Sequence, residues 1–167
     1  VDDFNGAMNA VEYLIKTGCK RIAHFAAPQH LLIGYQRQRG YISALEKNGI
    51  EVDDELIFKC DTIEHAKELT PKLMAMKNPP DAIFSVNDLT AIGALSALKK
   101  LNYKIPEDIS VIGFTDGLVS TVTEPPLTTV SQHGFDIGLK AAELLLARLD
   151  EDDKEHKAVT EVIKTDL

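Results

Sequence analysis

Residues 82–114, AIFSVNDLTAIGALSALKKLNYKIPEDISVIGF, have the pattern of a strand, a helix and a second strand. The short apolar runs at residues 82–86 and 109–114 have the length and composition of strands that are covered on both faces. Between them, residues 89–101 carry small and apolar side chains at helical spacing, and Asn87 is a residue type that caps helices. This order predicts a right-handed crossover between two parallel strands.

The same alternation continues on both sides of this unit. The expected helices are residues 5–17, 36–48, 64–77 and 135–149, and the expected strands are residues 21–27, 55–60, 127–132 and 158–164. A loop or short helix is expected at residues 115–126, and a solvated turn at residues 150–157. The 167 residues are therefore predicted to form one α/β domain, a doubly wound, mostly parallel sheet flanked by helices.

Two of the expected helices carry patterns that predict their packing. The helix at residues 89–101 has small residues on several faces, which predicts close packing against the sheet and against a second surface, such as a partner subunit. The helix at residues 135–149 is amphipathic. Its expected inward side chains are Ile137, Ala141, Leu144 and Leu145.

Composition and charge indicate a cytoplasmic protein that does not bind nucleic acid by itself. The formal net charge of −8 repels phosphate backbones, so this chain alone is not expected to bind DNA or RNA. Cys19 and Cys60 lack zinc-ligand spacing and are expected to be reduced thiols. No apolar run approaches the roughly 20 residues needed to span a membrane. Because the chain starts at Val1, we expect it to be cut from a longer protein.

Open parallel sheets bind ligands beyond the carboxyl ends of their strands. The segments expected there are residues 27–37, 61–63, 87–88 and 115–120. Arg37 is the leading candidate, because a guanidinium can hold two oxygens at once, although it could equally be a surface arginine. Asn87 could bind a ligand or only cap a helix, and Asp116 could accept from a ligand hydroxyl or only cap a turn.

No catalytic motif is found in the sequence. It contains no GxSxG, GxGxxG, P-loop or HExxH pattern. Among the five histidines, His24 falls in the middle of an expected strand and is predicted to be a core residue, whereas His30 is predicted to be an exposed loop residue. We therefore expect no catalytic residue, no metal site and no cofactor, and we expect binding rather than catalysis.

Five motifs in a fixed order resemble the lactose-repressor (LacI/GalR) family of transcription regulators. They cover nearly the whole chain, and the third and fourth are the most specific. The motifs are GCKRIA at residues 18–23, RQRGY at 37–41, PDAIFSVND at 80–88, IPEDISVIGF at 105–114 and PLTTV at 126–130, followed by Gln132.

The resemblance implies an effector-binding domain of the periplasmic-binding-protein type I fold, in which a saccharide or similar polar molecule lies between two α/β lobes. This chain would be one lobe, with residues 133–157 packing on an N-terminal lobe that is absent, as is the DNA-binding head. By position, Arg37 matches the family's effector-binding arginine and Asn87 matches a residue that lines the cleft. The resemblance also implies a homodimer, DNA binding only through the missing head, and allosteric control by a change in the angle between lobes.

The chain departs from the family pattern at two places in the implied effector site. The family usually has an aspartate directly after the glycine–aromatic pair of the fourth strand, but here Thr115 stands there and Asp116 follows. After the PLTTV motif, the family's Q-x-F is replaced by Gln132, His133 and Gly134. The expected effector-binding residues are Arg37, Asn87, Thr115, Asp116 and Gln132.

Two other functions remain open at this point. A periplasmic sugar-binding protein of an uptake system could share the fold, and its gene would encode a leader peptide rather than a helix-turn-helix. An enzyme on a flavodoxin-like scaffold would need a catalytic group or a cofactor motif, neither of which is found.

Overall fold

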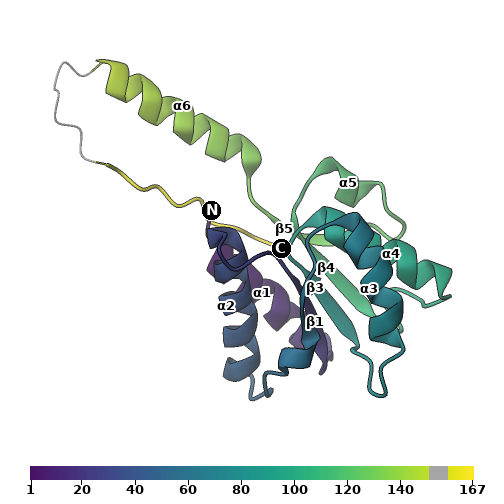
Figure 1. Cartoon of the computed structure of the whole chain (residues 1–167). Coiled ribbons are helices and arrows are strands. Elements are labelled where there is room, and N and C mark those ends of the chain that lie inside the picture. Colours follow the sequence, from purple (N-terminus) through teal and green to yellow (C-terminus); the bar gives the residue numbers. More distant parts are fainter. Residues whose placement is uncertain (151–157) are drawn as a thin grey trace.

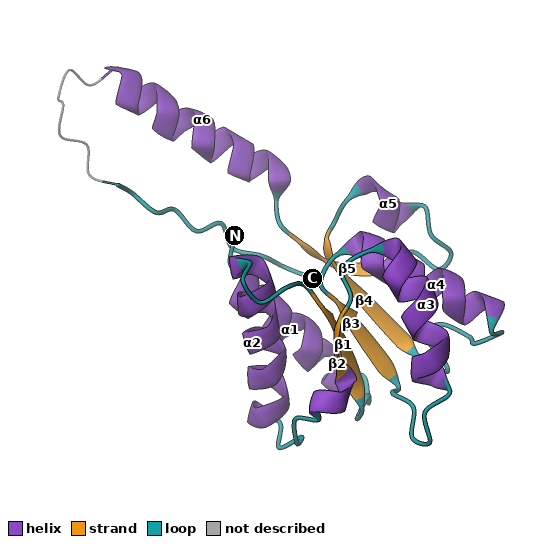
Figure 2. Cartoon of the chain, viewed as in Figure 1, coloured by secondary structure: helices purple, strands orange, loops and turns teal. Residues whose placement is uncertain are grey.

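The computed structural model describes residues 1–150 and 158–167. Its centre is a five-stranded sheet with strand order β2-β1-β3-β4-β5, in which every neighbouring pair is parallel (Figure 2). The predicted α/β fold class is therefore confirmed. The strands are β1 (Ile22–Ala26), β2 (Ile57–Lys59), β3 (Ala82–Ser85), β4 (Ser110–Thr115) and β5 (Thr128–Ser131).

Helices cover both faces of the sheet (Figure 1). Helices α1 and α2 pack together against one face, and α3 and α4 pack together against the other. Because successive strand residues point to opposite faces, Ile83 belongs to the core under α3 and α4, whereas Phe84 belongs to the core under α1 and α2. The helices are α1 (Asp3–Lys16), α2 (Leu32–Lys47), α3 (Ile63–Met74), α4 (Asp88–Lys100), α5 (Leu118–Thr121) and α6 (Gly134–Asp150), with a short 3-10 helix at Asp54–Leu56.

The small residues of α4 contact a neighbouring helix of the same chain. A Cβ atom added at Gly93 would lie 2.5 Å from the backbone oxygen of Ile63 and 2.8 Å from the side chain of Ala66, both on α3. The second surface predicted for this helix includes α3, and a partner subunit at α4 stays a prediction. A side chain larger than hydrogen at Gly93 would force α3 and α4 apart.

Two element boundaries differ from the prediction. Helix α2 begins at Leu32, four residues before its expected start at 36. The true start was missed because the N-cap residue, Leu31, has no side chain that can cap a helix and so gives no signal in the sequence. The strand expected at residues 55–60 is shorter, since a 3-10 turn precedes Ile57 and only Ile57–Lys59 pair with β1.

The C-terminal region departs most from expectation. Helix α6 leaves the sheet and projects away from it (Figure 1), and Ala141, Leu144 and Leu145 are exposed, so their inward placement was wrong for this chain. Residues 158–164 form no strand, and the one β-bridge found in the returning segment is the isolated antiparallel bridge between Ser131 and Asp166. The turn expected at residues 150–157 lies, after Asp150, outside the described residues.

Candidate functional site

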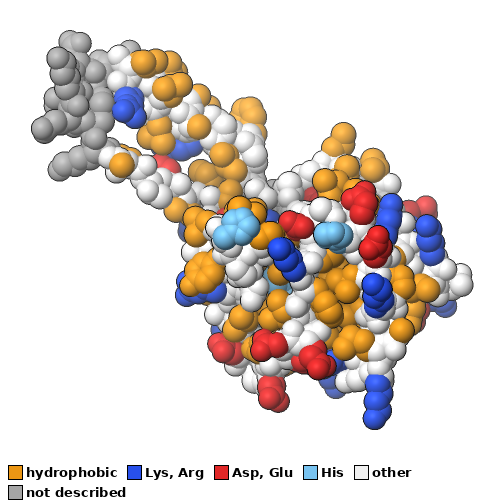
Figure 3. Space-filling model, in the orientation of Figure 1, with side chains coloured by type: hydrophobic (Ala, Val, Ile, Leu, Met, Phe, Trp, Pro, Cys, Tyr) orange, Lys and Arg blue, Asp and Glu red, His pale blue; other side chains and the backbone are white. Residues whose placement is uncertain are grey.

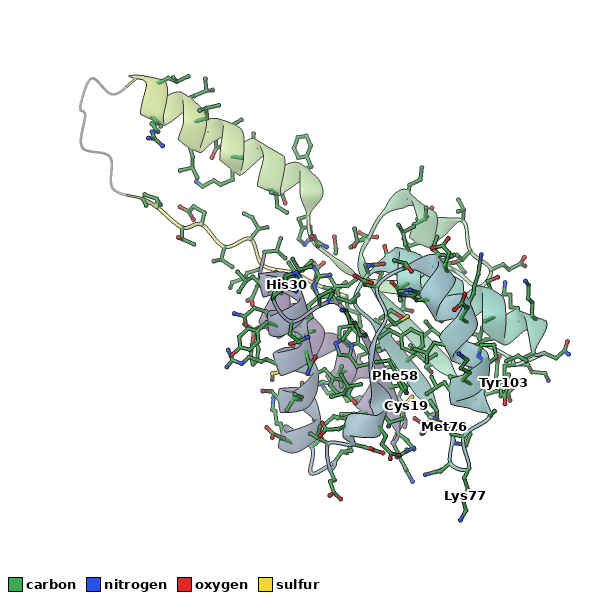
Figure 4. All side chains as sticks on the ribbon, in the orientation of Figure 1. Cys19, His30, Phe58, Met76, Lys77 and Tyr103 are labelled. Atoms are coloured by element: carbon green, nitrogen blue, oxygen red, sulfur yellow. The ribbon has the colours of Figure 1, made fainter. Side chains whose placement is uncertain are left out.

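Four of the five predicted site residues lie at the carboxyl ends of β3, β4 and β5. Asn87 follows β3, Thr115 ends β4, Asp116 comes next, and Gln132 follows β5. Arg37 lies on α2 and reaches the same edge, because its Nη1 donates a hydrogen bond to the backbone oxygen of Val86. We call this edge the ligand edge. His30 lies at this end, on the loop between β1 and α2, and is exposed as predicted, whereas Lys77 lies at the opposite end (Figure 4).

Arg37 is a buried residue with fixed partners. Its Nε and Nη2 atoms lie 2.8 Å and 2.6 Å from Oδ1 of Asp3, and its guanidinium carbon lies 3.6 Å from the centre of the Phe114 ring. Burial lowers the pKa of the guanidinium, and the Asp3 carboxylate opposes that shift. Since an arginine stays protonated in proteins, Arg37 is a buried cation. The surface-arginine alternative was therefore wrong.

The hydrogen-bonding capacity of Arg37 is only partly used within the chain. A guanidinium carries five N–H groups, and three of them are engaged by Asp3 and Val86. No partner for the remaining two N–H groups is found among the described residues. The charge and geometry of Arg37 thus suit an acceptor placed at the ligand edge.

Asn87 uses both ends of its side chain inside the chain. Its Oδ1 accepts a hydrogen bond of 2.8 Å from the backbone N–H of Thr90, and its Nδ2 donates to the backbone oxygen of Asp61 at 3.2 Å. The helix-capping role is therefore confirmed. A role in ligand binding stays a prediction, for which the second amide N–H is available.

Thr115 and Asp116 lie in a turn of unusual backbone conformation. Their φ angles are 152° and 60°, and both residues are exposed. Positive φ is strongly disfavoured for a β-branched residue such as threonine, so the turn persists only because its surroundings hold it. Strain of this kind is concentrated at binding and catalytic sites.

Gln132 is the third member of a polar group at the ligand edge, with Thr115 and Asp116. Its Nε2 donates a hydrogen bond of 3.3 Å to the Thr115 hydroxyl. The structure thus brings Gln132 and Thr115 together, with Asp116 adjacent in the chain. A hydroxyl, a carboxylate and an amide in one place supply both donors and acceptors for a polar ligand.

Asp88 and Thr129 were not among the predicted site residues. Asp88 was expected at this edge only as part of the segment 87–88, yet it is 2% exposed and its carboxylate accepts hydrogen bonds from the backbone N–H of Gly117 and from the Thr129 hydroxyl. An aspartate in the first turn of a helix usually indicates only a favourable charge at the helix start. No local pattern connects residues 29 and 41 positions apart, so this signal was absent from the sequence.

A cavity of about 370 Å³ lies at the opposite end of the sheet, away from these residues. Its lining includes Tyr13, Ile105, Ser110 and Pro126, from the end of α1 and the segments that lead into β4 and β5. We assign the candidate site to the ligand edge because the buried cation and the strained turn lie there.

Among the described residues, no group of three or more His, Cys, Asp or Glu side chains is arranged to hold a metal ion. None of the helices in the described part of the chain is long and apolar enough to cross a membrane.

Comparison with known proteins establishes the family. Residues 11–166 match the model of the periplasmic binding protein-like domain, and the chain belongs to that family. The chain is 38% identical over 150 residues to the transcriptional repressor CytR of Escherichia coli K12. The matched region covers 89% of this chain and 44% of CytR. This chain thus spans less than half the length of that relative.

Solved structures show the same relationship. A regulatory protein of the LacI family from Chloroflexus aggregans superposes with a TM-score of 0.86 at 33% identity, over 92% of this chain and 56% of that one. The transcriptional regulator CelR in complex with cellobiose superposes with a TM-score of 0.84 at 33% identity, over 93% of this chain and 48% of the CelR chain. The resemblance to the lactose-repressor family is therefore confirmed.

Proposed function

We propose that this chain is part of the effector-binding domain of a LacI-type transcription regulator and that its effector is a saccharide. The observation that carries the proposal is the polar group of Thr115, Asp116 and Gln132 at the ligand edge, beside the buried cation Arg37. Sugar hydroxyls both donate and accept, and they match this mixture of groups. Support also comes from a similar protein, CelR, whose structure was solved with cellobiose.

The ligand edge is proposed to be one wall of a two-walled cleft. Helix α6 carries exposed leucines, among them Leu139, Leu145 and Leu149, the last of which is 71% exposed. An isolated amphipathic helix rarely exposes such a row to water, which supports a second lobe packing on α6. Residues 133–157 would then belong to that lobe, as the family resemblance implies.

Three segments meet at the ligand edge and would form the hinge between lobes. The backbone N–H of Asp2 donates to the Ile163 oxygen at 3.0 Å, and the N–H of Ser131 donates to the Asp166 oxygen at 2.7 Å. The start of the chain, the exit from β5 and the returning segment therefore lie side by side (Figure 1). Effector binding between lobes would change their angle and so alter DNA binding by a separate head.

A homodimer is proposed on an apolar patch formed by Leu89 of α4 and Leu118 and Val122 at α5. These side chains are 50%, 83% and 75% exposed, and Figure 3 shows hydrophobic atoms over α5. Asp88 and Gly117, which precede Leu89 and Leu118 in the chain, are hydrogen-bonded to each other, so the starts of α4 and α5 lie close together. Exposed apolar patches of this kind mark protein interfaces.

The similar proteins distinguish between the candidate functions. CytR, CelR and the Chloroflexus protein are transcription regulators, which favours the regulator over a periplasmic solute-binding protein. We further propose that the domain has no catalytic activity and works in the cytoplasm, where a DNA-binding regulator acts.

A thermal-shift screen tests the proposal. The protein, expressed from its complete reading frame, is heated with monosaccharides, with oligosaccharides that include cellobiose, and with phosphosugars. Any ligand that binds only the native state raises Tm, by an amount that grows with its concentration relative to Kd. Complete absence of a shift with every saccharide would contradict a sugar effector.

A further inference from the structure

We propose that Asp88 and Thr129 are positioning residues that hold the β4 turn, defined as Thr115, Asp116 and Gly117, in the shape that presents its side chains to ligand. The proposal rests on the proposed function of the ligand edge. It assigns to two residues that do not face ligand a role in determining which ligand is bound.

Asp88 lies beneath the β4 turn and is bonded to it directly. Its Oδ2 accepts the backbone N–H of Gly117 at 3.0 Å, and its Oδ1 accepts the hydroxyl of Thr129. Asp88 is 2% exposed, whereas its partners Gly117 and Thr129 are half-buried. A charged acceptor makes stronger hydrogen bonds than a neutral one, and these bonds join the start of α4 to the turn and to β5.

Thr129 carries the connection to the second amide of the turn. Its Oγ1 donates to Asp88 and accepts the backbone N–H of Asp116 at 3.3 Å. The buried carboxylate thus fixes Gly117 directly and Asp116 through one hydroxyl. Two successive backbone N–H groups of the β4 turn are held by this pair of side chains.

The position of Asp88 depends on the absence of a side chain at Gly113. A Cβ atom at Gly113 would lie 2.4 Å from Oδ1 of Asp88. Gly113 pairs with Thr129 in the register of β4 and β5. The glycine therefore leaves the space in which the carboxylate reaches both of its partners.

The strain in the turn explains why such support is needed. Thr115 and Asp116 have positive φ angles of 152° and 60°. A turn in this conformation relaxes to a commoner one unless surrounding bonds oppose the change. Relaxation would move the Asp116 carboxylate and the Thr115 hydroxyl, the latter of which is also bonded to Gln132.

A simpler role for Asp88 is to stabilise the start of α4 by its charge. That role does not account for the bonds observed. The N-terminal N–H of Thr90 is already capped by Asn87, whereas both oxygens of Asp88 are bonded to residues outside α4. The carboxylate is therefore placed for the turn rather than for the helix alone.

The structural test compares Thr129→Val with Thr129→Ser in this chain by amide hydrogen exchange. Valine has the shape of threonine but lacks the hydroxyl, whereas serine keeps it. We expect exchange at Asp116 and Gly117 to accelerate about tenfold in Thr129→Val and to remain near wild type in Thr129→Ser. Exchange at Phe25 in β1 is the internal control. Equal acceleration at all these amides, or in both variants, would overturn the positioning role.

The binding test uses cellobiose as the probe, by calorimetry on the same variants expressed from the complete reading frame. If wild type binds, Thr129→Val should bind about tenfold more weakly, and Thr129→Ser should bind with an affinity near that of wild type. Unchanged affinity in Thr129→Val would overturn the ligand-facing part of the proposal. If wild type binds no cellobiose or other sugar of the screen, the proposed function fails, while the exchange measurement still decides whether the pair holds the turn.

Discussion

The guanidinium of Arg37 on α2 and the carboxylate of Asp3 on α1 form an ion pair of 2.6 Å at the ligand edge. The arginine side chain is 4% exposed and the aspartate side chain 13%. This contact joins the first residue of one helix to the middle of the next. It fixes the cation that we propose faces the effector.

Removing one partner of this pair should destabilise the chain. Asp3→Ala leaves a buried cation without its counter-ion, so we expect a loss on the order of 3 kcal/mol in the free energy of unfolding. Urea unfolding measures it. The matched control is Lys47→Ala, which removes a pair between α1 and α2 that is formed with Glu12 at 2.7 Å by a 60% exposed lysine. That loss should be below about 1 kcal/mol. Equal losses would contradict the importance of the Arg37 pair.

His24 should make stability depend on pH. Burial lowers its pKa from 6.5 to about 4, and its ring lies between those of Tyr41 and Phe84. The unfolded chain therefore binds a proton at higher pH than the folded chain does, so this stability is present above pH 6.5 and is lost as pH falls towards 4. The expected loss is on the order of 3 kcal/mol.

The variant His24→Asn isolates this contribution. The free energy of unfolding is measured against pH for both proteins, and carboxylate titrations cancel in the difference. We expect the wild type to lose more stability than the variant between pH 6.5 and 4. Parallel curves over that range would show that His24 does not titrate as its burial requires.

Replacing two helical glycines by alanine should change the stability of the chain in opposite directions. Gly93→Ala places a Cβ 2.5 Å from the Ile63 oxygen and should cost about 1–3 kcal/mol through overpacking between α3 and α4. Gly138→Ala on α6 meets no atom within 4 Å and should stabilise by about 0.5–1 kcal/mol through helix propensity. Thermal unfolding of both variants measures the difference. A Gly93→Ala protein as stable as wild type would contradict the close approach of the two helices.

The strands and the ligand edge could be predicted from sequence because their signals are local. Apolar runs such as residues 82–86, followed by a helix-capping residue, predict both a strand and the point where it ends. Arg37 was found by its motif and by its position near a strand end. Its burial could not be found in this way, because Asp3 and Phe114 reach it only through the tertiary fold.

The misplaced elements have tertiary causes. Residues 158–164 alternate like a strand, but in this chain they meet no open strand edge with which to pair, apart from the bridge at Asp166. The predicted face of α6 is apolar, but no other described residue covers Leu145, which is 59% exposed. The roles of Asp88 and Thr129 depend on hydrogen bonds between distant segments, which no sequence period records.

Self-association should depend on the patch of Leu89, Leu118 and Val122. Leu118→Glu puts a charge on a side chain that is 83% exposed, so the fold should be kept while a dimer dissociates. Sedimentation velocity compares it with Leu32→Glu, a matched change at a 71% exposed leucine on α2. We expect a dimer for wild type and for Leu32→Glu, and a monomer for Leu118→Glu. A wild-type monomer would remove the patch from the proposal.

The most direct test of a saccharide-binding ligand edge is calorimetric titration of the sugar that gives the largest thermal shift, using the protein expressed from its complete reading frame. Asp116→Ala is the informative variant because Asp116 is exposed, whereas Arg37→Ala would also break a buried ion pair. Glu107→Ala, exposed at the opposite end of the sheet, is the control. The proposal predicts at least about tenfold weaker binding for Asp116→Ala and wild-type affinity for Glu107→Ala. Equal affinity in all three proteins would contradict it.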